Sequence, residues 1–207
     1  MLIAHFYQKL FSFFLRILCI IGVLTMIGCS QKIEKYQNTT PEIDIFKYFE
    51  GNTQAWGMVQ DYSNQQVRRF FVTIKGTVAG QTLTLNEHFI YDDGEKQQRT
   101  WTINRLKDGT YEGTAGDIHG IARGRSVGNA FNWRYAMDVK TDKRTIRLNF
   151  DDWIYQQDER HLFNVTALNK WGIQVAQVTL FFEKLDALPE PVSKKDSESK
   201  SESNNTP

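Results

Sequence analysis

Apolar and polar side chains alternate along most of this chain, in short stretches that turn signals separate. Successive side chains of a strand point to opposite faces of a sheet, so an alternation with period two is typical of half-buried strands. Ser63-Asn64, Asp92-Asp93-Gly94 and Lys107-Asp108-Gly109 are residue types that favour turns. The pattern predicts ten strands: Gln54–Asp61, Val67–Gly76, Thr82–Tyr91, Gln97–Leu106, Thr110–Ala115, Gly120–Ser126, Asn129–Val139, Arg144–Trp153, His161–Asn169 and Gly172–Lys184.

Ten strands joined by short turns predict an all-β protein, built as an antiparallel up-and-down meander with a short N-terminal helix. Such a sheet removes its exposed edges by closing, and a closed barrel of about this size can hold one small ligand. The segment FEGNTQAWG (49–57) is similar to the start of a lipocalin or calycin barrel. An open curved sheet or a sandwich is the alternative.

Two segments depart from period two. Apolar residues at 43, 46 and 49 suit one or two helical turns over Ile43–Phe49. The segment Asp151–Arg160 interrupts the strands and suits a helical turn.

A predicted hairpin over Leu83–Ile103 contains the most informative polar residues. If Gly94 closes a three-residue loop, Tyr91 pairs with Glu95 and Glu87 with Arg99. Glu87 then lies on the apolar face of its strand, opposite Arg99. This pair is either an internal strut or the polar anchor of a pocket for a carboxylate or headgroup, beside Tyr91 and Trp101; an outward surface pair is a third interpretation.

Two further groups of residues are candidates for the barrel interior. Phe131, Trp133 and Tyr135 share one face of a strand, which makes them core residues or the wall of a pocket. Asp152 points inward and Asp151 outward, because Asp152 continues the apolar face of its strand. Paired carboxylates can serve acid/base chemistry or bind a metal, but a cap on the following turn with a bond to a nearby arginine is the favoured role for this pair.

The N-terminus reads as a targeting segment. An apolar run of eleven residues, Ile17–Ile27, follows Lys9 and Arg16, which is the length of a secretory signal rather than of a membrane span. Met26-Ile27-Gly28-Cys29 resembles the lipobox of bacterial lipoproteins, which implies cleavage before Cys29 and lipid attachment to it. Ser30 then favours the outer membrane, facing the periplasm; an uncleaved anchor is the alternative. The expected organisation is a signal peptide (1–28), a lipidated tether (29–40), the barrel domain (41–185) and a disordered polar tail (186–207).

Composition excludes several classes of function. The chain has 25 basic and 24 acidic residues, and two of the basic ones lie in the signal. This near-neutral balance argues against nucleic acid as a partner. Cys19 and Cys29 are the only cysteines, and the histidines show no metal-binding spacing, so no cofactor or metal is expected.

Several separated segments together resemble domain-of-unknown-function family 3833, a group of bacterial, mostly lipoprotein, sequences. They are FKYFEGNTQAWG (46–57), RRFFVTIKGT (68–77), LTLNEHFIYDDGE (83–95), GTYEGTAGDIHGIARGRSVGNAFNWRY (109–135), FDDWIYQQDER (150–160), NKWG (169–172) and VTLFFEK (178–184). The resemblance implies a secreted, lipid-anchored β domain with no agreed activity and no catalytic residues to carry over.

Three functions follow from these features. The first is a non-enzymatic lipoprotein, bound to the membrane through Cys29, whose barrel carries an apolar molecule such as a fatty acid or lipid. The second is a structural or interaction protein of the envelope with a packed barrel. The third is a lipid-modifying enzyme that uses Asp152 or Glu87 as its acid or base.

Overall fold

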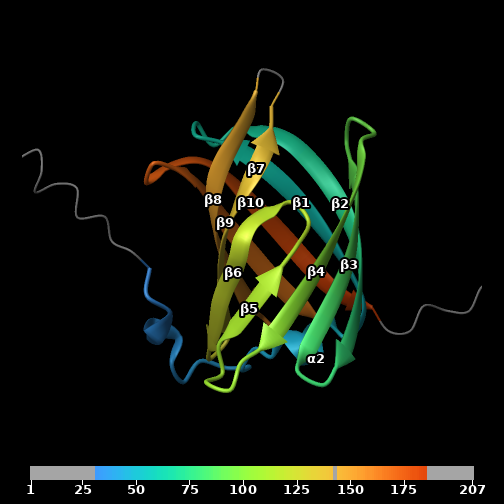
Figure 1. Cartoon of the computed structure of the whole chain (residues 1–207), viewed down its shortest axis with the longest axis vertical. Coiled ribbons are helices and arrows are strands. Elements are labelled where there is room, and N and C mark those ends of the chain that lie inside the picture. The colour runs from blue at the N-terminus through green and yellow to red at the C-terminus, as the bar shows by residue number, and fades with distance from the viewer. Residues whose placement is uncertain (1–30, 142–143, 186–207) are drawn as a thin grey trace, which may run out of the picture. The chain divides into compact units, whose positions relative to one another are not determined.

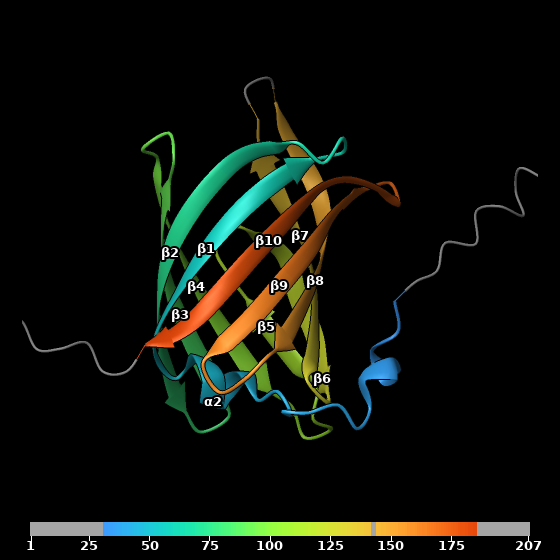
Figure 2. The same ribbon diagram turned by 180° about the vertical axis from the view of Figure 1, so that it is seen from behind.

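Ten antiparallel strands close into a barrel in the computed structural model, which describes residues 31–141 and 144–185. The chain divides into two units, Met1–Lys32 and Ile33–Pro207, and the fold described below belongs to the second. Each strand pairs with its neighbour in sequence, and β1 pairs with β10 (Figures 1 and 2). The strands are β1 (Gly51–Asp61), β2 (Gln66–Ala79), β3 (Thr82–Tyr91), β4 (Lys96–Arg105), β5 (Tyr111–Thr114), β6 (Ile118–Val127), β7 (Ala130–Lys140), β8 (Thr145–Gln156), β9 (His161–Lys170) and β10 (Ile173–Leu185).

The closing contact between β1 and β10 decides between a barrel and an open sheet. It runs from Asn52 opposite Leu185 to Asp61 opposite Ala176. The predicted closed barrel is therefore confirmed, and the open sheet and the sandwich are excluded.

The predicted register of the β3–β4 hairpin is also confirmed. Leu85 lies opposite Trp101, and Glu87 lies opposite Arg99. Gly94 has a φ of 86°, and the amide of Tyr91 donates to the carbonyl of Glu95 at 2.9 Å. The turn needs this left-handed residue, which glycine adopts without a Cβ clash.

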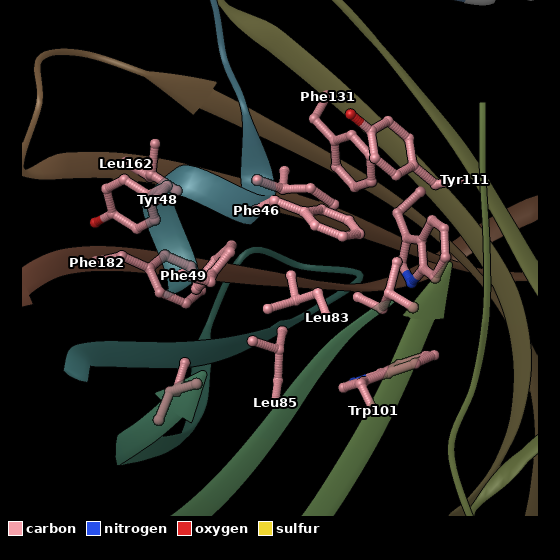
Figure 3. Packing of buried hydrophobic residues seen from close by; sticks show 14 of the residues in the cluster. Phe46, Tyr48, Phe49, Leu83, Leu85, Trp101, Tyr111, Phe131, Leu162 and Phe182 are labelled. Atoms are coloured by element: carbon pink, nitrogen blue, oxygen red, sulfur yellow. The ribbon is translucent and has the colours of Figure 1, made fainter. Parts of the chain in front are cut away.

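A short helix closes one end of the barrel, which we call the base. Helix α2 (Ile45–Phe49) begins after Asp44, whose carboxylate accepts hydrogen bonds from the amides of Phe46 (2.9 Å) and Lys47 (3.3 Å). At its other end, Lys184 Nζ donates to the carbonyls of Lys47, Tyr48 and Glu50 at 2.7–3.1 Å. Figure 3 shows the helix's aromatic side chains beside those of the strands; the cluster includes Phe46, Tyr48, Phe49, Leu83, Leu85, Trp101, Tyr111, Phe131, Leu162 and Phe182.

The opposite end, the mouth, is packed less completely. Most inward-facing apolar side chains near the mouth are half-buried, whereas most of those near the base are buried. A second cluster of buried residues, Leu148, Phe150 and Leu168, is the exception at the mouth and forms part of its wall. The half-buried inward residues are Val59, Phe70, Phe89, Tyr91, Met137, Val139, Ile146 and Val178. The interior is therefore filled at its base and partly exposed to solvent at its mouth, and we call this solvent-exposed end of the interior the cup.

The predicted helical turn at Asp151–Arg160 is wrong. Strand β8 continues to Gln156, because Asp152 and Ile154 remain paired with β9 and Trp153 is buried on the outer face under Tyr36. The turn after β8 is capped by Asp158 instead, which accepts from the amides of Arg160 and His161, both at 2.8 Å. The predicted cap by the pair Asp151-Asp152 is thus wrong.

The folded part begins earlier than the predicted boundary at Pro41. Residues Ile33–Tyr36 form a 3-10 helix, η1, in which Ile33 is buried. The Tyr36 ring lies 6.0 Å from that of Trp153 and 5.6 Å from that of Tyr155. Residues 33–40, expected as a polar tether, therefore pack on the barrel. The predicted signal (1–28), Cys29 and the predicted tail (186–207) lie outside the described residues.

Candidate ligand-binding site in the barrel

Glu87 and Arg99 face the barrel interior, as the period-two pattern predicts. Each side chain is only 14% exposed, and Arg99 Nη1 lies 4.0 Å from Glu87 Oε2. At this distance the two charges attract, but they share no hydrogen bond. The pair is therefore inward-facing, and the outward interpretation is excluded.

Asp117 is the closest partner of Arg99, and sequence reasoning missed it. Its Oδ2 accepts from Arg99 Nε at 2.9 Å and from Nη2 at 2.7 Å. Asp117 lies in the turn between β5 and β6, and the β4–β5 register, continued three residues past Thr102 opposite Thr114, leads to Arg99 opposite Asp117. The guanidinium of Arg99 also contacts the sulfur of Met137 at 3.2 Å. Arg99 is thus held from several sides by the chain itself.

Asp152 and Tyr135 complete the polar group. Asp152 lies opposite Trp133 on β7 and Thr166 on β9, and so points inward. Asp151 points outward, where Arg134 Nε donates to its Oδ1 at 3.0 Å. The predicted opposite orientations of the two aspartates are therefore confirmed. Glu87, Arg99, Asp117, Tyr135 and Asp152 are called the polar cluster below.

Burial in the polar cluster raises the pKa values of Glu87 and Asp152. Burial raises the pKa of Glu87 to about 7; Arg99 opposes this, while Asp117 and Asp152 add to it. Burial likewise raises the pKa of Asp152 to about 6, with Thr166, Arg99 and Tyr135 favouring its charged form. Burial also raises the pKa of Tyr135, which keeps its proton. Three carboxyl groups thus share one guanidinium.

Three carboxylate oxygens of the polar cluster lack a hydrogen-bond donor among the described residues. They are Glu87 Oε2, Asp117 Oδ1 and Asp152 Oδ1, and each atom is buried. A buried acceptor without a donor costs about 1–3 kcal/mol, and more when it is charged. The cluster can therefore accept hydrogen bonds from a molecule in the cup.

Aromatic rings lie below the polar cluster and fill the base. The ring of Trp101 is 5.8 Å from that of Trp133 and 5.2 Å from that of Tyr135. Trp101 and Trp133 are each 5% exposed. They are floor residues rather than the wall of an open pocket, whereas Tyr135 is half-buried at the boundary.

Aromatic rings also line the cup above the polar cluster. Tyr91 stacks on Phe89 at 6.2 Å, and the guanidinium of Arg68 lies 3.6 Å from the centre of the Tyr91 ring. Phe70 lies opposite Gly57 on the neighbouring strand β1, and a Cβ on Gly57 would come within 2.2 Å of the Phe70 ring. Glycine at position 57 therefore allows the ring to lie against the strand.

An open depression of about 460 Å³ lies on β7–β9 and the β9–β10 turn, but it is a weaker candidate. Its charged side chains, Arg134 and Asp151, already form an ion pair at 3.0 Å. Its lining residues are Arg134, Tyr135, Asn149, Phe150, Asp151, Asn169 and Gly172. The cup, in contrast, has acceptors without donors, so we regard the cup as the site.

Two features are absent from the described part of the chain, a metal-binding group and a membrane-spanning helix. Residues 31–141 and 144–185 contain no group of three or more His, Cys, Asp or Glu residues placed to hold a metal ion. Over the same ranges, none of the helices is long and apolar enough to cross a membrane.

The model of one protein family, described as "Protein of unknown function (DUF3833)", matches residues 23–184. The chain belongs to the DUF3833 family. The predicted resemblance is thus confirmed over more than half of the chain. No curated protein matches this DUF3833 chain.

Two solved structures are similar to this DUF3833 protein. The first is an S-type phycobiliprotein lyase from Guillardia theta, with 8% identity and a TM-score of 0.52; the match covers 77% of this chain and all of the lyase. The second is an odorant-binding protein, with 12% identity, a TM-score of 0.32 and coverage of 73% and 80%. At this identity the lyase supports the fold alone, a barrel of the lipocalin or calycin type.

Proposed function

We propose that this DUF3833 protein binds a small, largely apolar molecule in the cup of its barrel, with the molecule's polar end at the polar cluster. The observation that carries the proposal is a combination of two features. The apolar side chains of the cup are partly exposed to solvent at the mouth, and three buried acceptors of the polar cluster lie between these side chains and the aromatic floor. Ligand sites of this kind are mostly apolar, with a few polar groups that fix orientation.

The charges of the polar cluster favour a ligand whose polar end donates hydrogen bonds. Arg99 already has Asp117 and Glu87 as partners, so a carboxylate ligand would bring a fourth acidic group to one guanidinium. An ammonium or hydroxyl group would instead donate to the unpaired oxygens and be attracted by the negative charge. Among lipids, this favours one with an amine or hydroxyl end over a fatty acid.

The proposed setting is the cell envelope. The lipobox-like segment at Met26–Cys29 supports lipid attachment at Cys29, and Ser30 supports the outer membrane with the barrel in the periplasm. We propose binding or carriage rather than catalysis, since the acidic residues of the polar cluster serve equally well as hydrogen-bond acceptors for a ligand.

A matched set of ligands tests this proposal. Hexylamine, 1-hexanol and hexanoate share one apolar body and differ at the polar end. Binding is measured by calorimetry at pH 7.5 on the full chain in lipid nanodiscs, with empty nanodiscs as the blank. We expect hexylamine to bind at least about 10-fold more tightly than hexanoate, a difference of about 1.4 kcal/mol, with hexanol between them.

Two neighbouring aspartates provide the matched variants. Asp152→Asn removes an inward carboxylate and should weaken hexylamine binding about 5–10-fold. Asp151→Asn removes the adjacent outward carboxylate and should leave the affinity unchanged. Tighter binding of hexanoate would contradict the donor preference, and no binding of any of the three ligands would contradict the proposed function itself.

A further inference from the structure

A row of aromatic side chains crosses the outer face of the barrel. We define the aromatic belt as Trp56, Phe71, Phe163 and Phe181, with Ile90 at its end. Trp56 is 46% exposed, Phe163 44% and Ile90 49%. Exposed apolar surface that is continuous, rather than scattered, marks an interaction site.

Strand register makes the belt continuous. Ile90 lies opposite Phe71, Phe71 opposite Trp56, Trp56 opposite Phe181, and Phe181 opposite Phe163. The rings contact one another: Trp56 lies 5.7 Å from Phe71 and 6.2 Å from Phe181, and Phe163 lies 5.2 Å from Phe181. The belt thus runs across five neighbouring strands, β3, β2, β1, β10 and β9, and Figure 2 shows the wall formed by β1, β9 and β10.

Other large apolar residues are exposed on the same side of the barrel, among polar ones such as Thr73 and Lys75. Nine large apolar residues are exposed in the described part of the chain, and seven of them belong to β1–β3, β9, β10 or the turns between these strands. The seven are Trp56, Tyr62, Val67, Ile90, Phe163, Trp171 and Ile173. Leu106 and Ile121 lie elsewhere.

The opposite wall has a different chemistry. Ion pairs join its outward side chains across β5–β8: Glu112 with Arg123 at 3.1 Å, Arg134 with Asp151 at 3.0 Å, and Asp138 with Arg147 at 3.1 Å. Figure 1 shows the strands β5 and β6 of this charged wall. The outer surface is therefore amphipathic across the width of the barrel.

The path of the chain before the barrel indicates what covers the belt. Tyr155 lies opposite Phe163 in the register, and its ring lies 5.6 Å from that of Tyr36, so the belt continues to η1. Cys29 precedes Tyr36 by seven residues, which can span at most about 25 Å. A lipid on Cys29 would therefore hold the bilayer surface within reach of the belt. Trp, Tyr and Phe are favoured at such interfaces, where Trp and Tyr in particular are enriched.

We infer that the aromatic belt lies against the surface of the membrane that carries the lipid, with the charged wall of β5–β8 facing the aqueous phase. This inference rests on the proposed lipid anchoring at Cys29. The belt adds a second, non-covalent contact, which sets the orientation of the barrel on the bilayer.

Spin labels on single introduced cysteines test the inference. A mature chain cleaved before Cys29 retains no other cysteine, and lipidated Cys29 has no free thiol. Phe163→Cys and Ile90→Cys place labels at the two ends of the belt, and Thr114→Cys places a control label on exposed β5. The full lipidated chain is bound to vesicles of phosphatidylethanolamine and phosphatidylglycerol, and the collision of each label with oxygen and with a water-soluble nickel chelate is measured.

We expect both belt labels to collide more with oxygen and at least about threefold less with nickel than the Thr114 label does. Equal nickel exposure of all three labels on vesicle-bound protein would overturn the inference. So would dipolar broadening of the belt labels, since it would show that a second copy covers the belt. Release of the wild-type chain from the vesicles would overturn the anchoring and the inference together, while ligand binding in the cup is measured separately.

Discussion

Glu87 is a buried acid whose environment resists its ionisation. It lies opposite Arg99 but 4.0 Å from it, and the hydrogen bonds of Arg99 go to Asp117 instead. The sequence predicts the pairing because alternation and the turn at Gly94 fix the register. Asp117 lies beyond the end of β5, and only the β4–β5 register, continued past Thr102 opposite Thr114, leads to it. The polar cluster is thus only partly predicted from the alternation of side chains.

This arrangement predicts an unusual dependence of stability on pH. The pKa of Glu87 rises on folding to about 7, so the folded chain keeps a proton that the unfolded chain has lost. The free energy of unfolding therefore falls as pH rises toward and through 7. Glu87→Gln removes the ionisable group, so we expect it to raise the free energy of unfolding by roughly 1–3 kcal/mol at pH 8 and by less than about 1 kcal/mol at pH 5.

Urea unfolding at the two pH values measures this difference. Glu112→Gln is the control, because Glu112 pairs with Arg123 on the outer surface; its effect should stay within about 0.5 kcal/mol. Destabilisation of Glu87→Gln at pH 8 would show instead that the ionised pair with Arg99 is a stabilising strut.

Among the elements, the strands are easier to predict from the sequence than the segment Asp151–Arg160 and the helix η1. The ten strands and the short helix follow from periodicity, because strand pairing and burial act in the same direction at each residue. The helical turn predicted at Asp151–Arg160 is wrong. Polar residues interrupt the alternation there, although the segment continues a strand whose Trp153 is covered by Tyr36 on the outer face. The packing of η1 is not predicted either, because its contacts, such as those of Tyr36 with Trp153 and Tyr155, join segments far apart in the sequence.

The floor of the cup depends on close contact between β6 and β7. A Cβ on Gly124 would lie 2.4 Å from Trp133 Cε3 and 2.5 Å from the carbonyl oxygen of Asn132. Gly124→Ala must therefore displace the indole, and we expect a loss of roughly 1–3 kcal/mol in the free energy of unfolding. The thermal midpoint should fall accordingly.

Gly116→Ala is the matched control for this floor. No atom lies within 4 Å of its added Cβ, and its backbone is not left-handed. Its effect should be within about 0.5 kcal/mol. Equal midpoints for the two variants would contradict the close packing of Trp133 in the floor.

At the scale of the whole molecule, the barrel is closed at its base and open at its mouth. Ten strands joined by short turns favour closure, but they do not predict which end is closed, since that depends on the end at which α2 packs. The same asymmetry separates Trp101 and Trp133, which fill the floor, from Phe89 and Tyr91, which line the cup. The polar cluster lies between them, where a ligand from the mouth would place its polar end.

Native mass spectrometry of the full chain, extracted in a gentle detergent from the cells that produce it, tests the central claim most directly. We predict one bound species per chain, with a largely apolar body and an amine or hydroxyl end, that dissociates at raised collision energy. A mass equal to that of the folded chain alone would contradict the claim that the cup is a binding site.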